Sequence, residues 1–401
     1  MTGNSPSDGA TPLVSAFYDR FPYPGDPVQD GPPPGYNWRW SLDDIDSFCR
    51  GERRPAIEGM CILDAGCGTG VSTDYLAHLN PGTDILAIDI SAGALAVARE
   101  RLNRSGAHQQ ARVRLEQRSL LDLSAEGPFD HINSVGVLHH LAEPLAGLRA
   151  LAPLLVAGGT LHLFLYADAG RWEIHRIQRA LALLGASGDA EGLKLGRALL
   201  AELPEENRLR QRHEQRWAID TAPDANFADM YLHPQETSYD LRGLWDFLAA
   251  AGFRFLGFSN PEQWDLSRVL QGDLLERAQA LSQTERWLLM EALDPEISHF
   301  EFFVSNEELS PCSWGDDAAL LLAQPRRSRC LWGWPGQRLL DRNLAPLNLS
   351  EDQFALLEAL EACDADAPGL GDLPLAWTAE RRCAVARELL SSGVLSLARK
   401  A

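Results

Sequence analysis

Short apolar runs alternate with amphipathic stretches along the first half of the chain, which predicts strands and helices in turn. The apolar runs have strand length and predict strands at 61–66, 84–90, 112–119, 129–137 and 159–167. The amphipathic stretches predict helices at 71–79, 91–106 and 144–155, the second capped by Ser91 and closed by Gly106. Alternation over about a hundred residues is typical of a parallel sheet covered on both faces. The sequence therefore predicts an α/β, doubly wound fold.

The alternation is interrupted twice before the sheet closes. Helical periodicity fills residues 168–217 and 261–296, which we interpret as insertions. A helix at 239–253 precedes strands at 254–260 and 299–306, and the last of these alternates like an edge strand. We expect these two strands to form the antiparallel end of a mostly parallel, seven-stranded sheet. The domain that contains this sheet is predicted to span residues 58–306.

Both ends of the chain differ from this domain. Residues 1–57 are rich in aromatic side chains and prolines, and we expect them to form a lid. Residues 307–401 predict a helix within 345–363 and, within 378–398, a second helix followed by Gly393 and a short strand. With a small hairpin, these elements suggest a winged-helix-like accessory module. Because that module offers no basic recognition face, we expect it to dock or act as a lid instead of binding DNA.

The chain of 401 residues is acidic, with 36 Lys and Arg against 56 Asp and Glu, a net charge of −20. This balance disfavours nucleic acid as a partner. The Arg-rich stretch at 206–216 alternates with acids, which predicts a solvated helix face. The seven cysteines form no C-x-x-C pair, the first residues lack a signal-peptide pattern, and no apolar run has bilayer length. We expect a cytoplasmic protein without a membrane segment; the pattern leaves its oligomeric state open.

A glycine-rich loop follows the first predicted strand. The stretch ILDAGCGTG at 62–70 contains Gly66, Gly68 and Gly70. A dinucleotide fingerprint needs its third glycine one position later, where Val71 stands, and a phosphate-binding loop needs a Gly-Lys-Ser/Thr ending. The loop therefore predicts a different ligand.

Two acids accompany this loop: Asp64 in the strand before it and Asp89 at the end of the next strand. The pattern fits S-adenosylmethionine, which carries an ammonium and a carboxylate at one end, a ribose in the middle and no phosphate. Glycines let the methionyl chain pass close to the backbone. We expect Asp64 to balance the ammonium, directly or through water, and Asp89 to accept both ribose hydroxyls in the crevice at the carboxyl edge of the sheet.

Residues 58–166 resemble a class I S-adenosylmethionine-dependent methyltransferase in four motifs, which occur in the family's order. LDAGCGTG resembles the first motif and AIDIS resembles the ribose-binding strand end. EQRSLLDLS resembles the segment that frames the adenine, with Ser119 where an Asp is common. FDHINSVGVLHHL resembles the fourth strand, whose end faces the transferable methyl group. The resemblance implies cofactor contacts from Asp64, Gly66, Gly68, Gly70, Asp89, Ile90, Ser119, Leu120 and Ser134.

The methyl acceptor is harder to predict, because this chemistry mainly requires positioning of the acceptor. The segment after the fourth strand is not Asn-Pro-Pro-Tyr, so it does not resemble the amide and adenine amino methyltransferases that use that motif. No catalytic cysteine pair suggests the chemistry of pyrimidine C5 methylation. We expect the acceptor pocket to be lined from the aromatic lid and from two strand ends. The candidates are Tyr36, Trp38, Arg39, His139 and Tyr166.

A second group of candidates lies in the loop at 229–240. Asp229, His233 and Tyr239 are candidates for acceptor contacts, the first two also for a general base. A structural hydrogen bond is an equally good interpretation of His233. We expect no metal site, because His139 and His140 lack a visible third ligand.

The aromatic head, this loop and the appended module also resemble a methyltransferase family that is associated with cyanobacteria. Within it, the enzyme that N-methylates an asparagine amide of phycobiliprotein β subunits is similar in length and layout. The resemblance implies methylation of a protein side chain, with Asp229 and His233 beside a weakly nucleophilic amide. Two alternatives remain: a small-molecule methyltransferase in a pigment, quinone or natural-product pathway, and a non-catalytic cofactor-binding regulator.

Overall fold

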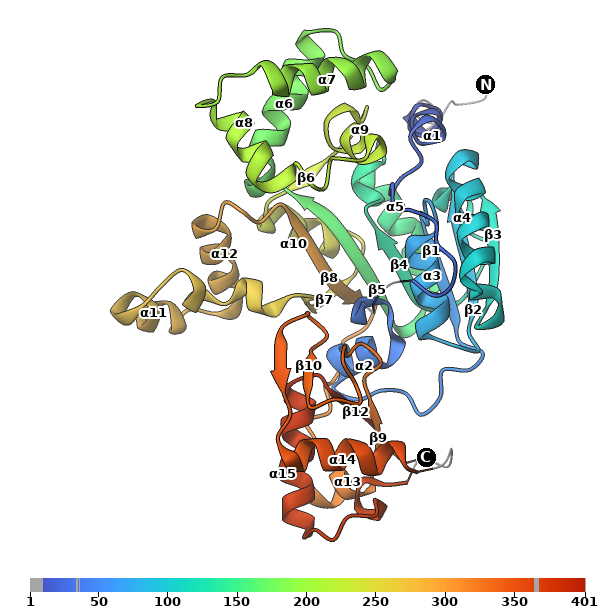
Figure 1. The fold of residues 1–401 in the computed structure, drawn as a ribbon, viewed down its shortest axis with the longest axis vertical. Coiled ribbons are helices and arrows are strands. Elements are labelled where there is room, and N and C mark those ends of the chain that lie inside the picture. Colours follow the sequence, from blue (N-terminus) through green and yellow to red (C-terminus); the bar gives the residue numbers. More distant parts are fainter. Residues whose placement is uncertain (1–9, 34, 36, 364–367, 401) are drawn as a thin grey trace.

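A twisted sheet forms the centre of the molecule in a computed structural model, which describes residues 10–33, 35, 37–363 and 368–400 (Figure 1). Seven strands follow the order β3-β2-β1-β4-β5-β8-β7, and β6 pairs with the end of β5. The strands are β1 (Cys61–Ala65), β2 (Asp84–Asp89), β3 (Arg112–Gln117), β4 (Phe129–Val135), β5 (Leu155–Ala167), β6 (Ser238–Tyr239), β7 (Arg254–Phe258) and β8 (His299–Ser305). The α/β, doubly wound prediction is confirmed.

The direction and position of the last two strands differ from the sequence prediction. β8 pairs antiparallel with both β5 and β7, so β7 runs in the same direction as β5 and only β8 is reversed. We expected an edge strand at 299–306, and this was wrong: β8 lies inside the sheet, and β7 is the edge. Five of the seven β8 residues are buried, because neighbouring strands cover both of its sides.

Alternate side chains of the strands pack against helices on opposite faces. Ile62 faces a cluster with residues of α2, α3 and α4, and Leu63 faces a second cluster with residues of α5, α10 and α12. The helices of these two layers are α2 (Leu42–Arg50), α3 (Val71–Leu79), α4 (Ala92–Ser105), α5 (Pro144–Leu151), α10 (Leu241–Ala250), α11 (Gly272–Gln279) and α12 (Gln283–Leu293). Ser91 caps α4 and Gly106 ends it in the left-handed conformation, as predicted.

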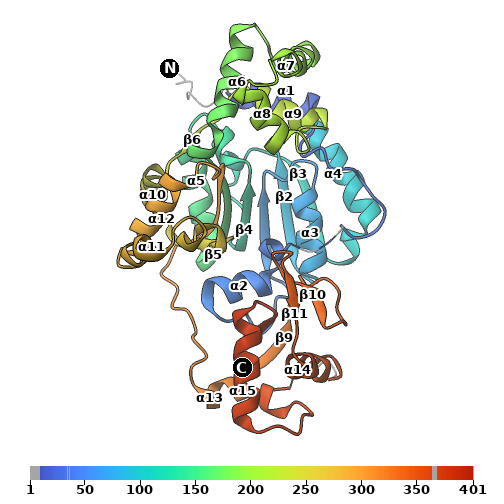
Figure 2. The ribbon, with the colours of Figure 1, turned by 60° about the vertical axis from the view of Figure 1, so that its left-hand side comes forward.

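A helical subdomain stands over the carboxyl edge of the sheet (Figure 2). It consists of α6 (Trp172–Leu183), α7 (Ala190–Glu202), α8 (Arg208–Arg212), a π-helical turn at His213–Trp217 and α9 (Asp224–Leu232). Helix α1 (Ala10–Arg20) packs into the same cluster through Phe17, beside Phe227 and Tyr231 of α9. The insertion thus extends beyond the predicted limit of 217, because α9 completes its core.

The C-terminal residues form a module at the opposite end of the molecule (Figures 1 and 2). It contains α13 (Asp317–Leu322), β9 (Gln324–Arg327), β10 (Arg338–Leu340), β11 (Pro346–Asn348), α14 (Glu351–Glu361), α15 (Ala379–Ser391) and β12 (Leu395–Ala398). β10 and β11 form a hairpin, and β9 pairs with β12. The winged-helix likeness stays a prediction.

Contacts at the end of α2 hold this module in place. The indole Nε1 of Trp314 donates to the carbonyl oxygen of Gly51 at 2.7 Å, and the N–H of Arg53 donates to the carbonyl oxygen of Leu397 at 2.8 Å. Among the described residues no helix is long and apolar enough to cross a membrane.

Candidate active site

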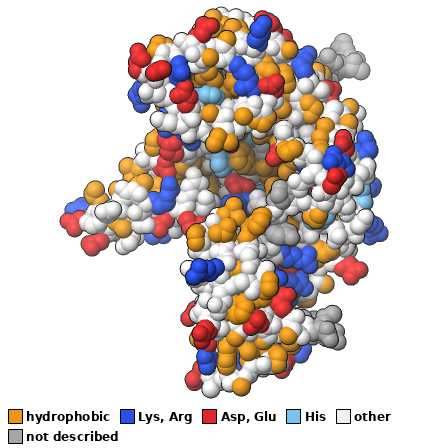
Figure 3. Space-filling model, viewed as in Figure 1, with side chains coloured by type: hydrophobic (Ala, Val, Ile, Leu, Met, Phe, Trp, Pro, Cys, Tyr) orange, Lys and Arg blue, Asp and Glu red, His pale blue; other side chains and the backbone are white. Residues whose placement is uncertain are grey.

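A cavity of about 560 Å³ lies at the carboxyl edge of the sheet, beneath the helical subdomain. Figure 3 shows the molecule hollowed on this face, with histidine and acidic side chains in the hollow. Its walls come from the loops after β1, β2, β3 and β4, the start of β8, the N-terminal segment and α9. No lining residue comes from the described part of the C-terminal module, and the expected docking or lid role of that module stays a prediction.

The glycine loop forms one end of the cavity and is covered by the N-terminal segment. Gly68 has a φ of +52°, and a Cβ there would lie 2.3 Å from the carbonyl oxygen of Tyr23. That same oxygen accepts the N–H of Thr69 at 3.0 Å, and the Thr69 hydroxyl donates to the carbonyl oxygen of Pro24 at 2.8 Å. Gly68 therefore allows the N-terminal segment to lie directly on the loop, which the sequence motif did not indicate.

The other loop glycines face two different neighbours. A Cβ at Gly66 would lie 2.3 Å from Val137, in the loop after β4, and a Cβ at Gly70 would lie 2.9 Å from Ala98 of α4. Gly66 and Gly68 line the cavity, whereas Gly70 does not. The third glycine of the motif thus allows close packing of α4, and its predicted cofactor contact stays a prediction.

Asp89 lines the cavity at the end of β2, with both carboxylate oxygens held in place. Oδ2 accepts the N–H of Gly68 and Oδ1 accepts the N–H of Ser91, each at 2.8 Å. Burial raises the pKa of Asp89, and these backbone donors oppose that effect. Each carboxylate oxygen can accept further hydrogen bonds, so the orientation suits two neighbouring hydroxyls, as in a ribose.

Asp64 lies behind the loop and is not among the residues that line the cavity; its expected role of balancing an ammonium group, directly or through water, stays a prediction. Its carboxylate is buried and accepts the hydroxyls of Ser72 and Thr73 at 2.7 and 2.6 Å and the amide of Asn133 at 2.8 Å. These donors join the end of β1 to the start of α3. The buried carboxylate is therefore satisfied inside the protein and fixes the loop's geometry.

The predicted residues after β2 and β3 reach the cavity, and the one in β4 does not. Ile90, Ser119 and Leu120 line it. The Ser119 hydroxyl accepts the N–H of Leu121, so its oxygen already serves as a helix cap. Ser134 is buried and donates to the carbonyl oxygen of Ala65, because alternation along β4 turns its side chain away. Val135, Gly136 and Val137 take its place at the wall.

The other end of the cavity is polar. Asp229 is buried, and its carboxylate accepts the hydroxyl of Tyr18 at 2.9 Å and that of Tyr166 at 3.4 Å. The Arg171 guanidinium lies over the Tyr166 ring, 3.5 Å from its centre. Burial raises the pKa of Asp229, while His140, Tyr18 and Arg171 oppose that effect. The side chains of Asp229, Tyr18, Tyr166 and Arg171 line the same wall. Tyr18 and Arg171 were not among the predicted site residues.

Three histidines, His139, His140 and His233, lie close together at this end of the cavity, which the sequence did not indicate. His140 lines the cavity, whereas the predicted His139 is fully buried and stacks on Tyr166 at 3.7 Å between ring centres. Neither is solvent-facing. His233 is excluded from the cavity wall, and its ring centre lies 3.8 Å from that of His140. The sequence analysis named His139 and His233 as candidates, but the histidine that lines the cavity is His140.

Several acceptor-pocket candidates lie elsewhere. Trp38 is fully buried against Phe303, and Arg39 forms an ion pair with Glu301 at 2.6 Å. Tyr239 is partly buried and packs against Phe247 beside the core. These three side chains help to hold the sheet together and do not line the cavity.

The aromatic head nevertheless reaches the cavity through other residues. Tyr36 lies outside the described residues. Trp40 lines the cavity, where its indole Nε1 donates to Asn133 at 3.1 Å. Tyr18 and Tyr23 line it as well. Since aromatic residues cluster densely in the head, composition alone could not separate those in the wall from those in the core.

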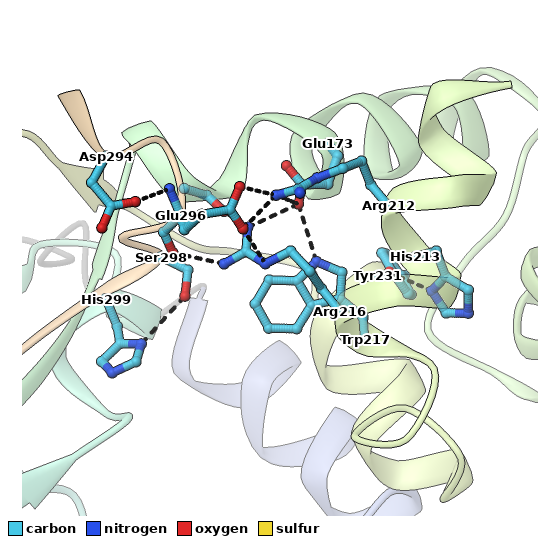
Figure 4. Close-up of polar contacts among 11 residues, drawn as sticks. Glu173, Arg212, His213, Arg216, Trp217, Tyr231, Asp294, Glu296, Ser298 and His299 are labelled. Carbon is cyan, nitrogen blue, oxygen red and sulfur yellow. Dashed lines mark hydrogen bonds and ion pairs between the residues drawn. The ribbon is translucent and has the colours of Figure 1, made fainter. Parts of the chain in front are cut away.

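An ion-pair network fastens the roof of the cavity (Figure 4). Glu173 is fully buried, and its Oε1 lies 3.2 Å from Arg216 and 3.7 Å from Arg212. Both arginines also pair with Glu296, at 3.1 and 2.6 Å. The solvated face predicted for 206–216 is therefore wrong at these two positions. The π-helical turn in this segment carries Trp217, which lines the cavity and donates to Glu173.

Comparisons with known proteins agree with this geometry. Residues 63–161 match a family model described as a methyltransferase domain. A Synechococcus sp. protein that carries the name "Uncharacterized protein syc1184_c" is 50% identical over 357 residues, 88% of this chain and 85% of that protein. An "Uncharacterized phycocyanin operon protein W" of Pseudanabaena tenuis is 53% identical over 92 residues, 23% of this chain and 86% of that protein.

Two further similarities concern one named enzyme and one solved structure. A ubiquinone biosynthesis O-methyltransferase of Xanthomonas campestris is 39% identical over 112 residues, 27% of this chain and 44% of that protein. The structure of PKMT2 from Rickettsia typhi in complex with AdoHcy has a TM-score of 0.62 at 17% identity, covering 92% of this chain and 77% of that one. The second similarity shows that the fold is shared over almost the whole chain.

The strand order, the glycine loop with Asp89 and the matched domain define an S-adenosylmethionine-dependent methyltransferase of class I. S-adenosylmethionine is its cofactor. Within that class, the chain belongs to the same family as the Synechococcus and Pseudanabaena proteins.

Proposed function

We propose that this enzyme transfers a methyl group from S-adenosylmethionine to a side-chain nitrogen of a protein, with an asparagine amide of a phycobiliprotein β subunit as the foremost candidate. The bound cofactor supplies an electrophilic methyl group on a sulfonium. The chain's own residues hold the nucleoside, exclude water and orient the acceptor.

The residues at the loop end of the cavity fit the cofactor. Asp89 offers two oriented oxygens for the ribose, and Gly136 lines the cavity where a Cβ would meet no atom within 4 Å. Ser119 and Leu120 stand beside the expected adenine. A cavity of about 560 Å³ is in the usual range for one small ligand. Beside the cofactor, the cavity can therefore admit an acceptor group such as a side chain.

The observation that carries the proposal is the buried polar group at the other end of the cavity. Asp229, with Tyr18 and Tyr166 as donors, faces the space where the acceptor must enter. An amide nitrogen is a weak nucleophile, and a hydrogen-bond acceptor beside it can orient it for the transfer. The name of the Pseudanabaena relative supports a phycobiliprotein as the source of that amide.

A small-molecule acceptor is the second candidate. Phe164, Trp217 and Met230 line the acceptor half of the cavity and would suit a flat apolar compound. The Xanthomonas enzyme supports this reading only in part, because the similarity covers 27% of this chain.

Transfer of a labelled methyl group distinguishes the two candidates. Purified enzyme with methyl-labelled S-adenosylmethionine is added separately to isolated phycobiliprotein β subunits and to a cyanobacterial lysate. We expect label on the β subunit, and mass spectrometry should place one methyl group on an asparagine side chain. Asp229→Asn should abolish this transfer, and Asp84→Asn, at the far end of β2, serves as control. Label confined to an organic extract of the lysate would overturn the protein acceptor.

We also place the reaction in the cytoplasm. All seven cysteines are free thiols, which is in keeping with a reducing compartment. Fractionation of cells that express a tagged chain tests this location.

A further inference from the structure

One residue, Gln235, contacts both histidines beside the acceptor end of the cavity. Its backbone N–H donates to Nδ1 of His233 at 3.1 Å. Its backbone carbonyl lies 3.0 Å from Nδ1 of His140, and its side-chain amide donates to the His140 carbonyl oxygen at 3.0 Å. The backbone N–H of Gln235 thus binds one ring, and its backbone carbonyl binds the other.

These two contacts fix the tautomer of each ring. A backbone N–H can only donate, so Nδ1 of His233 carries a lone pair and the neutral ring has its proton on Nε2. A backbone carbonyl can only accept, so Nδ1 of His140 carries a proton and the neutral ring has its lone pair on Nε2. Burial lowers the pKa of both rings, that of His233 to about 2, which favours these neutral forms.

The free nitrogens then have opposite chemistry and different positions. His140 lines the cavity, and within the described part of the chain its Nε2 has no hydrogen-bond partner. His233 does not line the cavity, and its Nε2 is buried without a partner. One ring nitrogen of each histidine and one carboxylate oxygen of Asp229 lie within 4.8 Å of one another. His140 therefore presents a base to the cavity, whereas His233 presents an N–H to the interior.

We propose that His140 receives the acceptor's proton during methyl transfer, and that Gln235 and His233 are positioning residues. The inference rests on the proposed function for the nature of the acceptor. The acceptor nitrogen forms a bond to the methyl carbon, and the carbon–sulfur bond breaks with its electron pair on sulfur. The nitrogen's proton passes to Nε2 of His140, so that charge and atoms balance.

The charges around His140 suit this role. Burial is the largest influence and lowers its pKa; Asp229 and Glu236 raise it, and Arg171 lowers it. A proton taken up by His140 during the reaction is thus stabilised by the carboxylate of Asp229 on α9. The surrounding rings, His139 and His233, are held neutral because burial lowers their pKa values as well.

Asp229, His140 and His233 are also close enough together to be considered for a metal ion. The tautomers argue against that use. The lone pair of neutral His233 lies on Nδ1, where it already accepts the N–H of Gln235, so this ring has no free lone pair for a cation. Only two ligands would remain, which is fewer than protein zinc sites provide.

Nuclear magnetic resonance on the ¹⁵N-histidine-labelled full chain tests the tautomers without any acceptor. At neutral pH we expect His140 with its proton on Nδ1 and His233 with its proton on Nε2, assigned by His140→Gln and His233→Gln. The opposite pair of tautomers, or a charged His140, would overturn the inference and leave the proposed function untouched. A shift of both Nε2 signals on adding stoichiometric Zn²⁺ would also overturn it.

Kinetics test the chemical role, with the protein labelled in the transfer experiment as acceptor. Loss of a general base costs about 10²-fold or more, so His140→Gln should lose at least that in turnover and retain its affinity for S-adenosylmethionine. Its remaining activity should no longer fall at acid pH. His233→Gln should keep the acid fall of the wild type, and exposed His108→Gln should match the wild type throughout. An unchanged acid fall in His140→Gln would refute the role of His140.

Discussion

At the residue scale, we propose two roles for the Asp89 carboxylate. Its oxygens accept the N–H groups of Gly68 and Ser91 and so fix the glycine loop, and the same oxygens are proposed to accept the ribose hydroxyls. Asp89→Asn removes the charge and replaces one acceptor oxygen with an amide. We expect the dissociation constant for S-adenosylmethionine to rise at least tenfold, since a hydrogen bond to a charged group contributes about 1.5–3 kcal/mol. Calorimetric titration measures this.

The control for Asp89→Asn is Asp84→Asn on the same strand. Asp84 pairs with exposed Arg112 at the other end of β2, so its loss should leave the dissociation constant unchanged. Equal affinities for both variants would remove Asp89 from the cofactor site.

Gly68 allows the backbone of the N-terminal segment to approach the glycine loop closely. Gly68→Ala would place a Cβ 2.3 Å from the Tyr23 carbonyl oxygen, on a backbone with a φ of +52°. We expect the N-terminal segment to lift from the loop, with a loss of both unfolding free energy and cofactor affinity. Gly59→Ala has a similar φ of +77° and open space around it, so it isolates the backbone cost of about 1–2 kcal/mol. Urea unfolding should show a loss of unfolding free energy for both variants. Calorimetric titration should show a loss of cofactor affinity only for Gly68→Ala.

At the scale of elements, the helical subdomain is fastened by charges that the sequence pattern hides. Arg216 pairs with Glu173, which is fully buried, and joins the π-helical turn to the segment before β8 (Figure 4). Arg216→Met leaves a buried carboxylate short of a partner. We expect a loss of about 3 kcal/mol in unfolding free energy, measured in urea, and faster proteolysis of the subdomain.

A double variant separates the unpaired charge from lost packing. Glu173→Gln in the Arg216→Met background removes the buried charge and should recover much of the loss. Arg112→Met removes an exposed ion pair, with the Arg112 side chain 79% exposed, and should cost at most about 1 kcal/mol. A similar cost for Arg216→Met would mean that this network does not fasten the subdomain.

At the scale of the whole molecule, buried neutral histidines make stability depend on pH. Burial lowers the pKa of His131 to about 3 and that of His233 to about 2, and it lowers those of His139, His140 and His299 as well. In the unfolded chain these rings titrate near pH 6.5. Below that pH the unfolded chain binds more protons than the native one, so acid favours unfolding.

We therefore expect the unfolding free energy to fall as the pH drops from about 6.5 toward the native pKa values, by about 1.4 kcal/mol per pH unit for each histidine. Urea unfolding between about pH 8 and about pH 5 measures the slope. His131→Gln should reduce the slope by about one proton, and exposed His108→Gln should not change it. A slope that is the same in all three proteins would contradict this account.

The sequence by itself determined the alternation of strands and helices, the glycine loop and the acid at the end of β2. These features are local: periodicity, caps and turns act between residues that are neighbours along the chain. For this reason Ser91, Gly106 and Asp89 stand where the pattern put them. The same local pattern did not reveal that β8 lies inside the sheet, because strand order depends on contacts between distant segments.

Only the tertiary structure decided which side chains face the cavity. Trp38 and Trp40 are two residues apart, yet one lies in the core and the other in the cavity wall. His140 faces the cavity and His233 stands behind it, because Gln235 holds both rings. Which side chain faces the cavity depends on how α1, α9 and the ends of four strands pack together. This packing depends on contacts between distant segments, so the local sequence of one segment does not determine it.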